Sequence, residues 1–409
     1  MAGKKREPIR EKDIQGLKYF KMFLPLLERL HEVGCERDKA GNRTLHFDQY
    51  CLLLLLSFFN PITRSMRGIQ QASELRKVQR KLGCQRTSLG SLSEAKTVFD
   101  PDKLAAIVAQ LGEQLKPFHH DPRLADVKHL VTLVDGTLIK GLPVLMQSAL
   151  EDSSSARLRD KCRWHTQFEL ERWLPVRIDV TDGIGKGAAD ERAVLEKALE
   201  KGRCYVEDRG YAKYKLFNAI VKAESSYVCR MKDNSAYQVL EQRALSSEDS
   251  EAGVILDALV QLGESSKEDA RPDHPMRLVV VKIMPHPKRS KTGSVSASRG
   301  SLLIATNRLD LPAWIIALLY RYRWTVEIFF RFLKHILGCQ HLFSYDPRGI
   351  QIQAYCAIIA CMLINLWTGR KPNRRTYEMV CYYFLGLAEE DELLAHLAKL
   401  KASDDAQKA

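Results

Sequence analysis

The sequence of 409 residues has no apolar run long enough to cross a membrane. Its longest apolar runs are Cys51–Phe59 and Ala354–Trp367, and both fall short of the roughly 18 to 20 residues that a transmembrane helix needs. No apolar stretch follows the basic start, Met1 to Arg6, so we expect no signal peptide. These absences argue against a membrane-spanning protein.

The chain also lacks the cysteine pairs of a zinc site or a disulfide framework. Its 10 cysteines are scattered, and none belongs to a Cys-x-x-Cys pair. We therefore expect reduced, mostly buried thiols in a cytoplasm. A glycine-rich nucleotide-binding loop and internal repeats are missing as well.

What the sequence has is a globular composition with an excess of positive charge. Hydrophobic residues make up 45% and charged residues 28%, a balance typical of a folded chain, and the length predicts two to three domains. Lys and Arg number 63 against 50 Asp and Glu, which gives a formal net charge of +13. This excess favours a polyanionic partner, either nucleic acid or an acidic membrane surface.

Residues 1–122 are predicted to be helical. Phe47–Phe59 is apolar on nearly all sides, which is typical of the central helix of a small bundle. A capping box at Ser91 and Glu94 predicts the start of a later helix. Between them, Arg76–Lys81 is dense in cations; it could be a DNA-recognition unit or a solvated helix face, and the sequence leaves both open.

From His129 onward, the pattern changes to an α/β one. The predicted elements are, in order, a strand over His129–Val134, a hairpin of Cys162–Leu170 and Val176–Val180, a helix over Ala188–Lys201, a strand over Cys204–Val206, a helix over Lys213–Ala223 and a strand over Tyr227–Arg230. Such alternation predicts a mixed sheet flanked by helices.

A β-rich insertion is predicted over 226–304. It contains an acidic, serine-rich loop at Ser246–Glu251 and a basic loop at Pro285–Lys291. Strands are predicted at Leu278–Ile283 and Leu302–Thr306.

A long helix is predicted from Pro312 to about Gly338. One stripe of this helix carries the residues Tyr320, Arg323, Glu327, Arg331 and Lys334, and apolar residues cover most of the rest. A helix with so much apolar surface should be largely buried. Glu327 could therefore form a buried ion-pair ladder with Arg323 and Arg331, or belong to a functional site, and the spacing alone does not distinguish these readings.

Two aspartates add weight to the functional reading. Asp135 and Asp208 each end a predicted apolar strand and are each followed by a turn that contains glycine. Ligands usually bind at such strand ends in α/β folds, although a single strand-end aspartate is more often a turn former. Two Asp and one Glu make an all-oxygen site suited to Mg²⁺ or Mn²⁺, and a pair of such ions is suited to phosphoryl transfer.

At these positions the sequence resembles the DDE-type transposases of bacterial insertion sequences. The family signature Tyr-x2-Arg-x3-Glu-x6-Lys is matched at Tyr320, Arg323, Glu327 and Lys334. The segments Val134–Thr137 and Asp208–Tyr211 are similar to the motifs around the family's first and second aspartate. With these motifs the resemblance covers roughly 129–340.

The resemblance implies a catalytic domain with a ribonuclease H-like fold. Asp135, Asp208 and Glu327 would be the catalytic triad and would hold two Mg²⁺ or Mn²⁺ ions per active site. Seven further residues would bind DNA: Tyr320, Arg323, Arg331, Lys334, Arg209, Lys288 and Arg289. The triad would hydrolyse double-stranded DNA at the element ends and join the 3′ ends to target DNA, in a homodimer, in the bacterial cytoplasm near the nucleoid.

The same resemblance suggests how the chain is divided. The expected parts are a helical DNA-binding domain (1–122), the first part of the catalytic domain (123–225), the β-rich insertion (226–304), the completion of the catalytic domain by the Glu-bearing helix (305–345) and a helical C-terminal region that could serve dimerisation (346–409). Some relatives grip a flipped base with a tryptophan of the insertion. None of the five tryptophans of this chain lies in 226–304, although Tyr227, Tyr237 or His286 could substitute.

Three alternatives remain open. A nuclease or resolvase with the same fold would use the same triad without strand transfer. A catalytically silent, element-derived protein would only bind DNA, and the presence of all three carboxylates argues against it. A metabolic metalloenzyme acting on a small phosphorylated molecule fits the charge of +13 least well.

Overall fold

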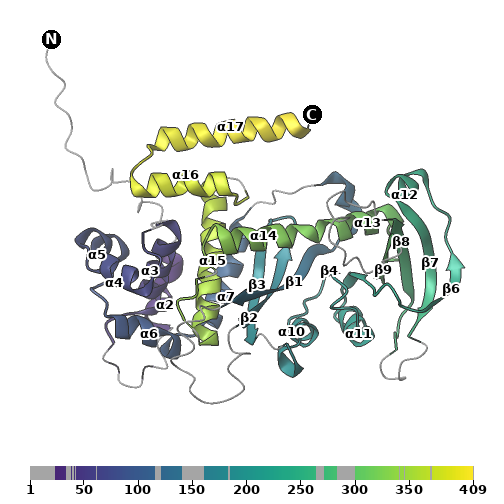
Figure 1. Cartoon of the computed structure of the whole chain (residues 1–409), viewed down its shortest axis with the longest axis horizontal. Helices are drawn as coiled ribbons and strands as arrows, with labels where there is room; N and C mark the ends of the chain where they lie inside the picture. The colour runs from purple at the N-terminus through teal and green to yellow at the C-terminus, as the bar shows by residue number, and fades with distance from the viewer. Residues whose placement is uncertain are drawn as a thin grey trace, which may run out of the picture. The chain divides into compact units, whose positions relative to one another are not determined.

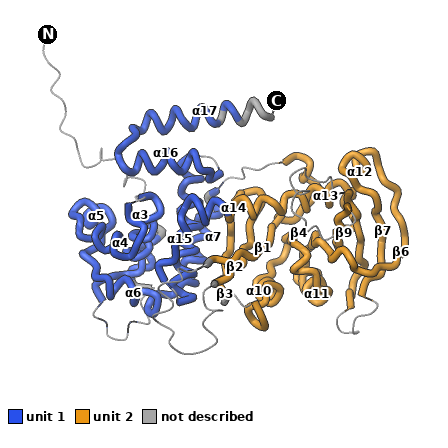
Figure 2. The backbone as a smooth tube through the Cα atoms, in the orientation of Figure 1, with its two compact units in different colours: residues 1–116, 140–153, 331–409 blue, residues 117–139, 154–330 orange. Residues whose placement is uncertain are grey.

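The computed structural model of the chain describes most of its helices and strands (Figure 1). The described residues are 24–33, 38, 41, 43–60, 62–115, 121–140, 161–182, 185–263, 271–282, 300–339, 341–344, 346–368 and 371–408. Two compact units emerge, each built from segments that lie apart in the sequence (Figure 2). The first comprises 1–116, 140–153 and 331–409, and the second comprises 117–139 and 154–330.

The first unit is helical. Its helices are α1 (Leu24–Glu28), α2 (Leu30–Val33), α3 (Phe47–Phe59), α4 (Met66–Ser73), α5 (Arg76–Leu82), α6 (Leu89–Val98), α7 (Asp102–Gln114), α15 (Pro347–Thr368), α16 (Arg374–Leu385) and α17 (Glu390–Lys408). Every residue of α3 is buried, which confirms that it is a central helix. The core helix α15 packs on α3, α6 and α7, so N-terminal and C-terminal helices share one core.

Helix α15 is also long and apolar enough to cross a membrane, with a mean hydropathy of 1.7 over its most apolar window. The expectation that no segment reaches this length was therefore wrong, because Ile350 and Ile352 extend the apolar pattern across two glutamines. Within the protein, 89% of that window is buried. Gln353 is buried as well, and its side chain binds the backbone of His341 and Phe343 at 2.9 Å each. These contacts are those of a core helix.

Helix α6 begins three residues before its predicted start. Its N-cap is Ser88, whose side-chain oxygen accepts a hydrogen bond from the backbone N–H of Ser91 at 3.0 Å. Ser88 satisfies a free N–H of the first turn, so the predicted capping box at Ser91 and Glu94 is not used. The cationic segment ahead of it forms α5, in which Val78 and Leu82 are buried while Arg76, Lys77 and Arg80 are exposed.

The second unit contains a nine-stranded mixed sheet, in the order β3-β2-β1-β4-β5-β9-β8-β7-β6. Its strands are β1 (Leu130–Lys140), β2 (Lys161–Glu169), β3 (Leu174–Asp182), β4 (Arg203–Glu207), β5 (Ser226–Arg230), β6 (Tyr237–Gln242), β7 (Val254–Leu262), β8 (Met276–Lys282) and β9 (Ser301–Thr306). Strand β4 runs parallel to both β1 and β5, and the pairs β2–β3, β5–β9, β9–β8, β8–β7 and β7–β6 are antiparallel. The predicted mixed α/β sheet is confirmed.

Helices cover the sheet of the second unit. They are α10 (Glu191–Lys197), α11 (Tyr214–Lys222), α12 (Ser247–Glu251), α13 (Ala313–Tyr322) and α14 (Trp324–His335). The last residues of α14 belong to the first unit. Short 3-10 helices lie at Pro122–Val127 and Gly187–Ala189. In Figure 1, α10 and α11 lie on one side of the sheet and α13 lies on the other. Strand β4 is buried along its whole length, as expected for a central strand covered on both faces.

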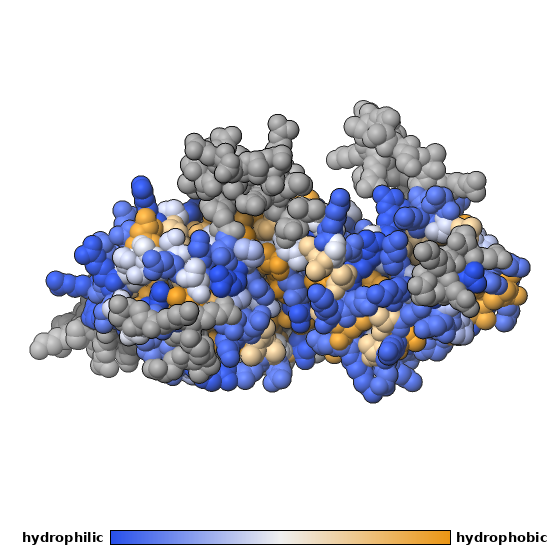
Figure 3. All heavy atoms as spheres, turned by 90° about the horizontal axis from the view of Figure 1, so that it is seen from below, coloured by the Kyte–Doolittle hydropathy of each residue, from blue (hydrophilic) through white to orange (hydrophobic). Residues whose placement is uncertain are grey.

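The face beneath α11 has an aromatic core. The rings of Phe217 and Tyr227 stack with centroids 4.2 Å apart, and Tyr205 belongs to the same buried cluster. The strands of 237–306 extend this sheet because β9 pairs with β5, with Val228 opposite Thr306. Hydrophobic side chains thus gather inside, and most of the described surface on the face drawn in Figure 3 is hydrophilic.

Three predicted elements differ in extent. The helix predicted over Ala188–Lys201 is the shorter α10, which Asp190 caps through the backbone N–H of Arg192 at 2.9 Å. The serine-rich stretch predicted as a loop forms α12, because Ser246 and Asp249 make a capping box. The long helix predicted from Pro312 divides into α13 and α14 at Arg323.

All nine cysteines in the described part of the chain are buried. This observation confirms the expected burial for those nine.

His165 on β2 makes the stability of the second unit depend on pH. Its side chain is 5% exposed, and its Nε2 lies 2.7 Å from Thr181 Oγ1. Burial, assisted by the positive charge of Arg163, lowers the pKa of His165 from 6.5 to about 4. Between these values the unfolded chain binds more protons than the folded chain, so stability present above pH 6.5 is lost as the pH falls toward 4.

We expect the free energy of unfolding to fall by about 2 kcal/mol more in the wild type than in a His165→Gln variant when the pH drops from 7.5 to 5. Urea unfolding of both proteins at the two pH values measures this difference. If the free energy of unfolding fell equally in the two proteins, His165 would not be buried in its neutral form.

Candidate active site

The first predicted catalytic residue, Asp135, lies within a strand. Strand β1 continues through Asp135 to Lys140, so the prediction that a glycine turn follows Asp135 was wrong. Strand β1 pairs with β4 only from Leu130 to Leu133, and Asp135 therefore lies just beyond the paired region. The carboxylate accepts a hydrogen bond from the backbone N–H of Gly136 at 2.8 Å.

Asp208 follows β4 directly, as predicted. Its Oδ1 accepts a hydrogen bond from the backbone N–H of Gly210 at 2.6 Å, which closes the predicted turn. Because β4 is parallel to β1 and their pairing ends at Leu133 opposite Val206, both aspartates lie just beyond the same end of the paired region. The preceding residue, Glu207, is fully buried, and burial raises its pKa well above the ordinary value, which favours its uncharged form.

Glu327 lies in the first turn of α14, within reach of Arg323. Arg323 Nη2 donates to Glu327 Oε1 at 2.5 Å, and Arg323 Nη1 lies 3.5 Å from Asp135 Oδ2. The Arg323 half of the expected ion-pair ladder is thus confirmed. One guanidinium joins two of the three predicted catalytic carboxylates, and its own side chain is 13% exposed.

The other two carboxylates influence the pKa of Asp135. Burial is the largest cause that raises the pKa of Asp135 from 3.8 to about 6; the positive charge of Arg323 opposes it, and the negative charges of Asp208 and Glu327 add to it. A carboxyl with such a raised pKa, coupled to two other acids, is typical of functional sites.

Three carboxylates are a donor set suited to a hard divalent cation. In the described part of the chain, however, no group of three or more His, Cys, Asp or Glu side chains is arranged so that it could hold a metal ion. Arg323 stands between Asp135 and Glu327 and neutralises part of their charge. The donor set therefore fits a divalent cation. In this structure, however, the Arg323 guanidinium contacts Asp135 and Glu327.

Tyr320 and Arg323 face the same cluster. The guanidinium carbon of Arg323 lies 6.0 Å from the centre of the Tyr320 ring. Burial raises the pKa of Tyr320, and the nearby cations Arg323 and Arg230 oppose that rise. Both residues line a hollow of about 890 Å³ with Trp324, which is 49% exposed.

The segment that leads into α13 is anchored in the interior of the second unit. Arg277 is 1% exposed and binds both carboxylate oxygens of Asp257, at 2.7 and 2.8 Å. Its Nη1 donates to the backbone carbonyls of Arg308 and Leu311, at 2.9 and 2.5 Å. These bonds fix the loop from which α13 and then α14 extend, and thereby the position of Glu327.

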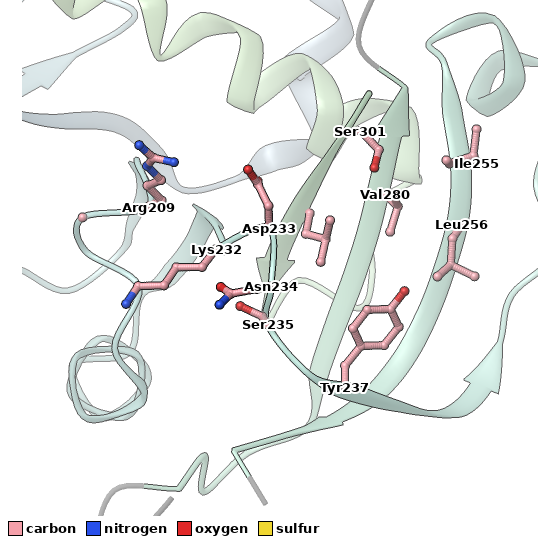
Figure 4. A pocket seen from close by; sticks show the side chains of 12 residues that line it. Arg209, Lys232, Asp233, Asn234, Ser235, Tyr237, Ile255, Leu256, Val280 and Ser301 are labelled. Atoms are coloured by element: carbon pink, nitrogen blue, oxygen red, sulfur yellow. The ribbon is translucent and has the colours of Figure 1, made fainter. Parts of the chain in front are cut away.

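A second hollow, of about 1080 Å³, is lined by Arg209 and Gly210, which follow Asp208 in the sequence (Figure 4). In the figure Arg209 and Lys232 lie on one side of it, and Tyr237 lies toward the strands that carry Leu256 and Val280. Arg209 and Lys232 are exposed, and neither forms a salt bridge with any residue that the structure describes. No sequence pattern marks Lys232, because it reaches the same hollow as Arg209 through the pairing of β4 with β5.

Four predicted DNA-binding residues remain, namely Arg331, Lys334, Lys288 and Arg289. Arg331 and Lys334 follow on α14, in the part of this helix that belongs to the first unit. Lys288 and Arg289 lie outside the described residues, as does His286.

The comparison with protein families decides which family this is. The profile described as the transposase DDE domain matches residues 126–363, more than half of the chain. The chain belongs to the DDE transposase family. The predicted resemblance is thereby confirmed, and members of this family generally use divalent metal ions.

Two curated relatives are transposases by name. One is transposase y4zB of Sinorhizobium fredii, 28% identical over 214 residues, which are 52% of this chain and 55% of that protein. The other is the transposase for insertion sequence element IS5377 of Geobacillus stearothermophilus, 28% identical over 213 residues, which are 52% of this chain and 50% of that protein. The chain thus spans about half the length of the curated relatives it matches.

Among solved structures, the cryo-EM structure of the piggyBac transposase synaptic complex with hairpin DNA is similar, with a TM-score of 0.41 and 11% identity. That match covers 96% of this chain and 87% of the other.

Proposed function

We propose that this DDE transposase cuts DNA at the ends of an insertion sequence and joins the 3′ ends to target DNA. The observation that carries the proposal is the gathering of Asp135 and Glu327 around Arg323, with Asp208 close enough to raise the pKa of Asp135. These three acids are those that the family motifs mark in the sequence.

Asp135, Asp208 and Glu327 would hold two Mg²⁺ or Mn²⁺ ions. When bound, such ions activate the attacking oxygen and stabilise the leaving oxygen in phosphoryl transfer. The task of the carboxylates would be to hold and orient these ions beside the reacting phosphate. We assign strands β3-β2-β1-β4-β5 to a ribonuclease H-like catalytic core, which is supported by an antiparallel hairpin beside parallel central strands.

Arg323 has two tasks in this proposal. In the protein alone it offsets the charge of Asp135 and Glu327. With DNA and metal bound, its guanidinium turns to the phosphate beside the cut, since bidentate bonds to phosphate suit an arginine. Tyr320 holds the guanidinium through its ring face and lines the adjacent hollow.

DNA would be held by the cations that surround this centre. Arg209 and Lys232 would bind backbone phosphates along the hollow of Figure 4, since neither cation has a salt-bridge partner in the described part of the chain. We keep Lys288, Arg289, Arg331 and Lys334 as further DNA contacts.

We also keep the five-part division of the chain, including DNA binding by 1–122 and dimerisation through 346–409. A homodimer that pairs two element ends in the bacterial cytoplasm is part of this proposal.

A strand-transfer assay, in which element-end DNA is joined to a target plasmid, tests the proposal. The full chain is incubated with Mg²⁺, labelled DNA ending in the terminal inverted repeat found beside its gene, and a target plasmid. We expect labelled plasmid, which forms only by strand transfer. Cleavage without labelled plasmid would favour the nuclease or resolvase alternative, and binding without cleavage would favour the silent DNA-binding protein.

A further inference from the structure

A fourth carboxylate lies between the two aspartate motifs. Glu191 is the first residue of α10, and its side chain is 21% exposed. A Cβ added to Gly136 would lie 2.9 Å from Glu191 Oε1, and a Cβ added to Gly210 would lie 3.6 Å from Glu191 Oε2. The carboxylate therefore rests against the backbone of both segments, immediately after Asp135 and two residues after Asp208.

Gly136 leaves the space that the Glu191 carboxylate occupies. At Gly136 any side chain would meet the Glu191 carboxylate below the distance that real Cβ atoms show. Strands β1 and β4 no longer pair at this point, since their pairing ends at Leu133 opposite Val206. Glu191 thus fills the space where backbone hydrogen bonds no longer fix the distance between the two chain segments.

Arg163 holds the carboxylate in this position. It extends from β2 and forms a salt bridge with Glu191 Oε1, and its side chain is 24% exposed. Arg163 Nε is buried and has no hydrogen-bond partner among the described residues, so the salt bridge through its terminal nitrogen is the polar contact that orients it. Removing the Glu191 charge would leave this guanidinium without its counterion.

We propose that Glu191, oriented by Arg163, is a positioning residue that sets the separation of Asp135 and Asp208 and so their capacity to hold a divalent cation together. This inference rests on the proposed function. The pair does not touch the reacting atoms; it acts through the backbone of Gly136 and Gly210. Groups that orient metal ligands in this way typically change metal affinity by about 10- to 100-fold when they are replaced.

Binding of Mn²⁺ alone to the full chain, measured by electron paramagnetic resonance, tests the inference. We expect Glu191→Gln to weaken Mn²⁺ binding by about 10- to 100-fold while the melting temperature changes little. Glu196→Gln on the same helix is the matched control, because the Glu196 carboxylate pairs only loosely, at 3.7 Å, with the exposed Lys215. This control should bind Mn²⁺ as the wild type does.

Two further variants separate positioning from folding. Arg163→Gln should weaken Mn²⁺ binding as Glu191→Gln does, and the double variant should be no weaker than either single one, because both remove one interaction. Gly136→Ala should also weaken binding, and combining it with Glu191→Ala should relieve the close contact and remove this additional effect.

Asp208→Asn distinguishes failure of this inference from failure of the proposed function. If the wild type binds Mn²⁺ and Asp208→Asn does not, while Glu191→Gln binds within twofold of the wild type, the positioning role is wrong and the catalytic site stands. If the wild type and Asp208→Asn bind Mn²⁺ equally, the proposed metal site itself fails, and the positioning role fails with it.

Discussion

Glu327→Gln is expected to lower metal-dependent cleavage of element-end DNA by about 10³-fold or more, with little change in DNA affinity. Glutamine keeps the shape of the side chain but removes the negative charge that would hold a metal ion. It also removes the negative charge beside Arg323 Nη2, which leaves Asp135 as the acidic partner of Arg323 within the described part of the chain. Single-turnover cleavage of labelled DNA, with binding measured by fluorescence anisotropy, separates the two effects.

Glu378→Gln is the matched control for this prediction. Glu378 pairs with Arg374 one helical turn away, the same local arrangement that Glu327 makes with Arg323, but its side chain is 43% exposed. We expect this variant to cleave DNA at the wild-type rate. If Glu327→Gln cleaved within tenfold of the wild type, the pairing with Arg323 would be structural and the assigned triad would be incorrect.

Much of the candidate site could be predicted from local sequence. Asp208 follows a strand whose five residues are all buried, and the adjacent Gly210 closes the predicted turn. The contact between Arg323 and Glu327 follows from helical spacing alone. Both predictions depend on residues within one turn or strand, where the covalent chain fixes the geometry.

The structure around Asp135 could not be predicted in the same way. The Asp-Gly pair is typical of a turn, yet β1 runs through it, and β1 has β2 as its neighbour on the side away from β4. Glu191 and Arg163 come from a helix and another strand, and no spacing in the sequence connects them to Gly136. Contacts between distant segments depend on the packed sheet.

The continuity of the nine-stranded sheet could not be predicted from the sequence for a similar reason. Strands β6 to β9 read as an insertion because a β-rich stretch interrupts the alternation of strand and helix. They join the rest of the sheet through β9, which pairs with β5 in a register that places Val228 opposite Thr306, two residues far apart in the chain. The sequence indicates that the strands exist, but not which edge they extend.

Asp257→Asn is expected to lower the free energy of unfolding by about 3 to 5 kcal/mol. Asp257 and Arg277 are 5% and 1% exposed at their side chains, so the substitution leaves a buried guanidinium without its counterion. Arg277 would retain only its bonds to the carbonyls of Arg308 and Leu311. Because that loop leads into α13, the position of Glu327 on α14 should become less defined. We therefore expect the rate of DNA cleavage to fall along with the free energy of unfolding.

Asp179→Asn is the control, because Asp179 binds Arg177 with the same two-bond geometry, at 2.7 and 2.9 Å, in a more exposed place on β3. We expect it to cost at most about 1 kcal/mol. Urea unfolding followed by tryptophan fluorescence measures both variants. A similar loss in the two would mean that geometry, and not burial, determines the strength of these ion pairs, and the anchoring role assigned to Arg277 would be withdrawn.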